Sequence, residues 1–286
     1  MTNRFAILLL CAAMVLAALA LPELAAGQTP TAIPGYENVK PLGPDGRVVN
    51  RRAIPRAADG KPDFTGVWAG PGFRHNVGVG DTDTPNVRQL DPKAFPPYKP
   101  GGESFMFRPH TDDLLIDDPT ALCLPNGIPR QLFSPYAQQW IYTPKQLIIL
   151  YEYMHFFRVI PIGAPNRAHA ANIEPTWMGD TIAWWEGDTL VLDTVGLKEW
   201  MWDASHEPSR WHSDQLHVVE KLTYADPMTA TYDIAFNDPK IFTAPWTTKW
   251  GMKLHPTWSI LEFVCEENNR CRAGECKLSP EQEGQK

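Results

Sequence analysis

Nine short segments rich in β-branched and aromatic residues follow one another between residues 136 and 265, and they constrain the fold more than any other feature. Turn-forming residues separate them, as at Glu186-Gly187-Asp188 and at Asn237-Asp238-Pro239. Short strands joined by tight turns are typical of antiparallel all-β folds, either barrels or sandwiches. Because the connections are short and sequential, we predict a meandering antiparallel barrel. The predicted strands are 138–144, 146–154, 156–162, 181–185, 189–195, 216–224, 229–236, 246–252 and 258–265.

The regions around these strands divide the chain into four parts. Residues 1–27 combine one Arg, an apolar run and a small-residue cleavage pattern, which predicts a secretory signal peptide. The run is too short for an anchor, so we expect no membrane span in the mature chain and a secreted or periplasmic location. Residues 28–61, rich in Pro, Gly and Arg, predict an extended arm. Residues 62–268 form the predicted barrel domain, with long loops and one or two short helices over 71–135, and 269–286 form a polar tail.

Charge and missing motifs exclude several classes of function. The formal net charge is −7, and loss of Arg4 and Glu23 with the signal peptide leaves it unchanged. A mildly acidic surface disfavours nucleic acid and anionic membranes as partners. The sequence has no GxGxxG after a strand, no P-loop, no GxSxG elbow, no SxxK and no CxxCH. We therefore expect a small-molecule ligand and no organic cofactor.

Four cysteines remain in the mature chain, and in an oxidising compartment an even number predicts disulfides. Three pairings are possible. We favour Cys123 with Cys265, which joins two structured regions, and Cys271 with Cys276, which closes a short polar loop. Their spacing matches no familiar zinc pattern.

Carboxylates inside apolar strands are the main clue to function. A two-residue turn at Gly187-Asp188 pairs Ile182 with Asp193, which puts Asp193 on an apolar face. By the same alternation, Glu152, Glu220 and Glu262 each share a face with apolar residues. A carboxylate in such a layer is costly unless it is paired or hydrogen-bonded, and otherwise its pKa rises.

Two interpretations of these carboxylates stay open. In the structural one, Glu152 forms an ion pair with Arg158 across a short bend, and other basic groups such as Lys249 and His169 lie in or beside the strands. In the functional one, several of the charged groups converge in a site for general acid and base chemistry. The candidate catalytic residues are His217, Glu220, His212, Asp193 and Arg158, with Arg158 holding an anionic or carbonyl group.

A second concentration of polar and aromatic residues lies between Trp200 and Glu220. His212 and His217 could bind a metal with Asp214 or Glu220, but no HxH or HExxH spacing is present, and His217 and Glu220 project from opposite strand faces. We therefore predict no metal, and a loop that caps the barrel mouth. Eleven Trp residues suit both a core and a pocket for a ring-containing ligand. The candidate substrate-binding residues are Glu152, Trp177, Trp184, Trp250 and Glu262.

Several blocks, including DGKPDFTGVW, PTWMGD, WEGDTLVLDT and LHVVEKL, resemble an uncharacterised family of exported bacterial proteins over roughly residues 59–268. That resemblance implies no activity, but it supports the pairing of Cys123 with Cys265, which lie within the shared region. Gly66-Val67-Trp68 is similar to the G-x-W of lipocalin-type barrels. The lipocalin likeness implies a cup-shaped barrel for a small apolar molecule, and in hydratase or cyclase relatives, cofactor-free acid and base chemistry.

We therefore expect an exported barrel that binds a small apolar or ring-containing molecule and carries out cofactor-independent acid and base chemistry of lyase, isomerase or hydratase type. The alternative is a carrier or binding protein of the cell envelope that uses the same barrel without turnover.

Overall fold

The computed structural model describes residues 53–69, 97–111, 117–165, 167–203, 209–267 and 269, without the side chains of Asp203 and Trp250. The predicted signal peptide, residues 28–52 of the arm, Cys271 and Cys276 lie outside these ranges. Residues 53–61 of the arm contact the turn between β6 (Asp180–Glu186) and β7 (Thr189–Val195). There Arg56 Nη1 donates to Asp188 at 2.8 Å, and Lys61 Nζ donates to the carbonyl oxygen of Gly187 at 3.0 Å.

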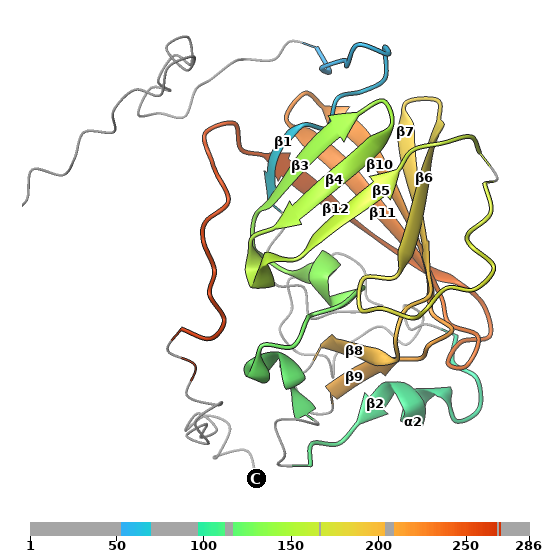
Figure 1. Cartoon of the computed structure of the whole chain (residues 1–286). Coiled ribbons are helices and arrows are strands. Elements are labelled where there is room, and N and C mark those ends of the chain that lie inside the picture. Colours follow the sequence, from blue (N-terminus) through green and yellow to red (C-terminus); the bar gives the residue numbers. More distant parts are fainter. Residues whose placement is uncertain are drawn as a thin grey trace, which may run out of the picture. The chain divides into compact units, whose positions relative to one another are not determined.

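Nine strands form one sheet in the order β5-β4-β3-β1-β12-β11-β10-β7-β6, and all neighbouring pairs are antiparallel (Figure 1). The sheet curls into a nearly closed barrel, which confirms the predicted all-β antiparallel fold. Its strands are β1 (Gly66–Ala69), β3 (Gln138–Thr143), β4 (Gln146–Tyr151), β5 (Phe157–Pro161), β6 (Asp180–Glu186), β7 (Thr189–Val195), β10 (His217–Asp226), β11 (Thr229–Asn237) and β12 (Trp246–Leu254).

The seam between β5 and β6 follows from the odd number of strands. In a ring of alternating directions, nine strands leave the two ends running the same way. A parallel bridge between Ile162 and Ala183 joins the two ends of the sheet. There the Gly163 amide donates to the carbonyl oxygen of Ala183 at 2.9 Å. The described residues form a single bridge at this seam, whereas β6 and β7 pair over seven register positions.

Aromatic and aliphatic side chains from the strands, and from Phe64 just before β1, pack together in a buried core. Trp68 and Trp140 stack with ring centroids 5.2 Å apart, and Phe64 stacks on Tyr224 at 4.8 Å. Each of these side chains is buried, as are the inward-facing aliphatic residues of β4, β7 and β11. Burial of so much apolar surface is the main stabilising contribution to the fold.

A small second sheet of β2 (Phe107–Arg108), β9 (Ser209–His212) and β8 (Trp200–Asp203) accompanies the barrel, in the order β2-β9-β8. The helices are short: α2 (Gly102–Met106) and the 3₁₀ helices η3 (Pro119–Leu122), η4 (Arg130–Phe133) and η5 (Tyr153–His155). The described part of residues 71–135 thus holds three short helices, where the sequence predicted one or two. None of the described helices has the length and apolar character to cross a membrane.

The predicted strand 258–265 is wrong. This segment pairs with no described strand, and Trp258 and Leu261 are exposed. Both edges of the preceding strand are already taken, since β12 pairs with β1 on one side and β11 on the other. The disulfide between Cys123 and Cys265, whose Cα atoms are 5.5 Å apart, links the end of this segment to the region around η3. The predicted pairing of these two cysteines is confirmed.

Candidate functional site

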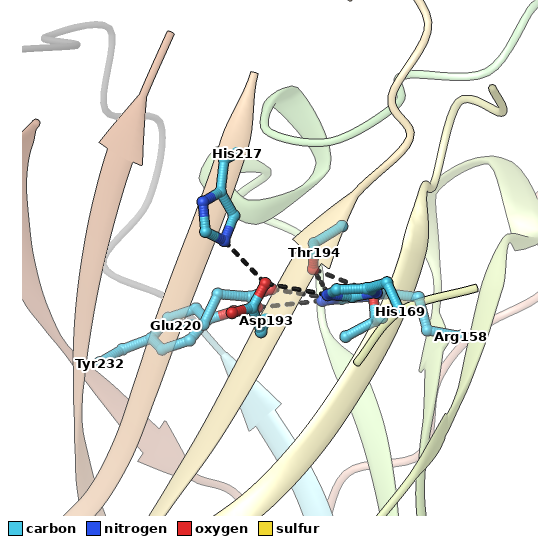
Figure 2. Close-up of polar contacts among 8 residues, drawn as sticks. Arg158, His169, Asp193, Thr194, His217, Glu220 and Tyr232 are labelled. Atoms are coloured by element: carbon cyan, nitrogen blue, oxygen red, sulfur yellow. Dashed lines mark hydrogen bonds and ion pairs between the residues drawn. The ribbon is translucent and has the colours of Figure 1, made fainter. Parts of the chain in front are cut away.

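Arg158 and Glu220 form a buried ion pair inside the barrel (Figure 2). Arg158 on β5 donates to both carboxylate oxygens of Glu220 on β10, at 3.0 and 2.7 Å, and its side chain is 3% exposed. Two threonine hydroxyls, Thr181 and Thr194, accept further hydrogen bonds from Arg158 at 3.0 Å, and the Tyr232 hydroxyl donates to Glu220. Burial by itself would lower the pKa of Arg158, but Glu220 outweighs it and raises the pKa above its usual value.

This ion pair corrects the predicted pair of Arg158 with Glu152. The carboxylate of Glu152 instead accepts a hydrogen bond from the backbone amide of Leu261 at 2.9 Å. Because Glu220 is fully buried and bonded in the interior, it does not face solvent with His217. In this pair the two charges neutralise each other, whereas either would be costly to bury alone.

The outer wall of the barrel carries a second cluster, built around Asp193. His217 on β10 directs Nε2 at Asp193 Oδ1 on β7, at 2.7 Å (Figure 2). Val219 lies on the same strand face as His217, and it is directly opposite Asp193 in the antiparallel register. The side chains of His217 and Asp193 therefore both point outward. The predicted pairing of Ile182 with Asp193 is confirmed, and it produces this arrangement.

The pKa values of the two groups move apart. Burial alone would raise the pKa of Asp193, but hydrogen bonds from His217 and His169 outweigh it and lower the pKa. The hydrogen bond to Asp193 raises the pKa of His217, against a smaller opposing effect of burial. Both shifts favour a carboxylate beside an imidazolium, and both side chains keep partial exposure, 19% for Asp193 and 36% for His217.

His169 and Asp180 extend the cluster. His169 lies in the connection between β5 and β6, and its Nε2 is 3.1 Å from Asp193 Oδ1. Its Nδ1 is 2.7 Å from Asp180 Oδ2, at the first residue of β6. The four side chains therefore form a chain of alternating carboxylate and imidazole, Asp180–His169–Asp193–His217, hereafter the outer chain.

His212 does not join the outer chain. It is fully buried on β9, where Nδ1 lies 3.0 Å from the carbonyl oxygen of Ser213 and the ring packs edge-on against Trp202. Burial lowers the pKa of His212 to about 4, so the ring is neutral at ordinary pH. Its position makes it a core residue rather than the proton-transfer group that the sequence predicted.

The predicted substrate-binding residues do not converge on one site. Trp184 is on the outer face of β6 and donates to Glu186 Oε1 at 3.3 Å. Trp177 packs edge-on against Trp200 at 6.0 Å and lies under the ammonium of Lys198 at 4.2 Å. Glu262 is exposed in the segment that we predicted as a strand, and the side chain of Trp250 lies outside the described atoms.

Sequence reasoning missed Asp180 and did not place His169. A signal for Asp180 existed, because extending the predicted register from Ile182 by two residues puts Asp180 on the face of Asp193. His169 had no such signal, since the connection that carries it has no periodicity. Asn237 was also missed, although it lies directly opposite His217 in the pairing of β10 with β11.

Among the described residues, no group of three or more His, Cys, Asp or Glu side chains is arranged to hold a metal ion. Comparisons of this chain with protein-family models, with curated proteins and with solved structures found no match.

Proposed function

We propose that this exported protein is an enzyme of lyase, isomerase or hydratase type that moves protons without an organic cofactor, with His217 as the proton-transfer group and Asp193 as its orienting carboxylate. One observation carries the proposal. An imidazole and a half-buried carboxylate meet at 2.7 Å on the barrel wall with partial access to solvent. Such pairing of a histidine with an orienting acid is the arrangement that general acid and base catalysis requires.

The direction of the hydrogen bond assigns the two ring nitrogens of His217. Nε2 faces Asp193, so in the neutral ring it carries the proton and donates it to the carboxylate. Nδ1 is then the basic atom, and it makes no hydrogen bond with any described residue. A substrate proton would pass to Nδ1, leaving an imidazolium that Asp193 stabilises, and the same nitrogen would return the proton to another position of the substrate.

Asn237 can supply the hydrogen bond that we expected from Arg158. It lies opposite His217 on the same outer face, and directly opposed residues of antiparallel strands have Cβ atoms about 4.5–5.5 Å apart. Its carboxamide can donate to a carbonyl oxygen on which charge develops while His217 removes a neighbouring proton. We therefore favour a small ring-containing carbonyl compound as substrate.

The packed interior supports a site on the outer wall rather than in the lumen. Trp68, Trp140 and Tyr232 are buried in the interior, which is where a lipocalin-type ligand would bind. Partial exposure of the outer chain, by contrast, allows a substrate to approach His217.

The test is proton exchange. Wild-type protein is incubated in D₂O with a panel of cyclic ketones and lactones, and loss of the α-proton signal is followed by ¹H NMR. We expect His217→Gln to slow exchange of any reactive probe by about 100-fold or more, with an unchanged circular dichroism spectrum. His255→Gln, a partly exposed histidine that stacks on Trp258, is the matched control and should exchange like wild type. If His217→Gln exchanges every probe at the wild-type rate, His217 is not the proton-transfer group.

A further inference from the structure

The outer chain continues beyond the pair that we assign to proton transfer, and its two further members have no direct access to His217. Asp193 Oδ1 faces both imidazoles, with His217 Nε2 at 2.7 Å and His169 Nε2 at 3.1 Å. A carboxylate bonded from one side only can rotate about its Cβ–Cγ bond. With donors on two sides, its oxygen is held where the His217 ring needs it.

His169 is itself held from both sides. Its Nδ1 faces Asp180 Oδ2 at 2.7 Å, and its Nε2 faces Asp193 Oδ1. A neutral imidazole can donate to only one partner, so the ring satisfies both carboxylates only when both nitrogens carry a proton. The ring therefore bridges the two carboxylates, with one nitrogen directed at each.

The backbone around Asp180 fixes the end of the chain. Thr176 donates its amide to the carbonyl oxygen of Gly196 at 3.0 Å, and Lys198 returns a hydrogen bond to Thr176 at 3.0 Å. Gly179, in a left-handed conformation with φ +69°, lies so close to β7 that an added Cβ would be 2.7 Å from Thr194 Cγ2. Asp180 therefore begins β6 directly after a closely packed turn, and its carboxylate forms the hydrogen bond with His169.

We propose that Asp180 and His169 are positioning residues, which hold Asp193 in the orientation that fixes the tautomer of His217. This inference rests on the proposed function and extends it to two residues outside the assigned pair. Asp180 acts through His169, and His169 acts through Asp193. Neither needs to touch the substrate.

The experiment compares Asp180→Ala, which removes the acceptor, with Asp180→Asn, which keeps an acceptor oxygen without the charge. Three quantities are measured: the ¹⁵N shifts of the His217 ring, which report the fraction of the Nε2-protonated tautomer, and kcat and KM for the most reactive probe. We expect Asp180→Ala to lower the Nε2-protonated fraction and to reduce kcat about 10-fold with KM unchanged. Asp180→Asn should restore kcat to within about threefold of wild type.

The matched control is Asp188→Ala, which removes a carboxylate from the other end of the same hairpin, where its partner is Arg56. It should leave the His217 shifts and kcat unchanged. Wild-type shifts and kcat in Asp180→Ala would overturn the positioning role, while a slow His217→Gln would still uphold the proposed function. Conversely, if His217→Gln remains fully active, the His217 shifts in Asp180→Ala still decide the positioning role. If Asp180→Ala does not fold, His169→Gln is measured in its place, and unchanged His217 shifts there would overturn the inference.

Discussion

His212 and His217 are near neighbours in the sequence, yet the structure gives their rings opposite environments. His212 is sealed in the core, where burial lowers its pKa to about 4, whereas the hydrogen bond to Asp193 raises the pKa of His217. The two residues therefore respond to acid in opposite ways. The sequence alone could not distinguish the two rings. His212 ends one strand and His217 begins the next, and burial depends on which residues pack over each ring.

His212 should make the protein sensitive to mild acid. Its folded pKa lies below the ordinary value of about 6.5, so the unfolded state binds the proton first and stability falls as pH drops from about 6.5 to 4. We expect this residue to remove about 2 kcal/mol between pH 7 and pH 5. Urea unfolding of wild type and His212→Gln at both pH values measures this, and the variant should lose less stability on acidification.

His217 provides the internal contrast for that measurement. Its folded pKa is raised, so its contribution is fully present below the ordinary histidine pKa and is lost as pH rises through the folded value. The His217→Gln variant should therefore lose more stability than wild type when the pH falls from 7 to 5. Equal pH dependence in wild type and His212→Gln would contradict the assignment of acid sensitivity to the core ring.

At the scale of elements, local patterns predicted the hairpins well. Strand β7 and the register of β6 with β7 agree with the sequence because a two-residue turn at Gly187-Asp188 fixes the pairing. The failure of the segment 258–265 has a non-local cause, since both sides of β12, the strand that it follows in the sequence, are already paired with other strands. Periodicity shows which segments can form strands, and neighbours decide which of them do.

The turn before β6 offers a test at this scale. Gly179 and Gly60 both have positive φ, but an added Cβ at Gly60 would meet nothing within 4 Å, whereas at Gly179 it would meet Thr194 and Val195 at 2.7 Å. Gly60→Ala should therefore cost about 1–2 kcal/mol for the left-handed conformation alone. Gly179→Ala should cost about 1–3 kcal/mol more through crowding. Urea unfolding of both variants checks this, and equal losses would show that β7 yields to the added methyl group.

For the whole molecule, the barrel was predictable but its closure was not. Short strands and tight turns predict the all-β architecture, while the strand order depends on β1 pairing with β3 on one side and β12 on the other. That long-range step decides that β5 and β6 meet, and so that Arg158 reaches Glu220 rather than Glu152. No window of the sequence contains this information.

The disulfide should contribute to the stability of the whole barrel. It links positions 142 residues apart, and closing a loop of that size restricts the unfolded chain by roughly 5 kcal/mol in the chain-entropy treatment. We expect the double variant Cys123→Ser/Cys265→Ser to lose about 2–5 kcal/mol in guanidinium unfolding. Dithiothreitol should lower wild-type stability to that of the double variant measured in dithiothreitol. Any further loss caused by dithiothreitol in the double variant would come from Cys271 and Cys276.

The parallel seam also has a consequence for how a protein built in this way can change over evolutionary time. Hairpins enter or leave a β-barrel two strands at a time, so gaining or losing one keeps the strand number odd. Every descendant that changes only by whole hairpins would keep one parallel junction, between the two strands at the ends of its sheet. Only the gain or loss of a single strand would remove the parallel junction. The buried Arg158, which donates across it to Thr181, would then need other hydrogen-bond partners.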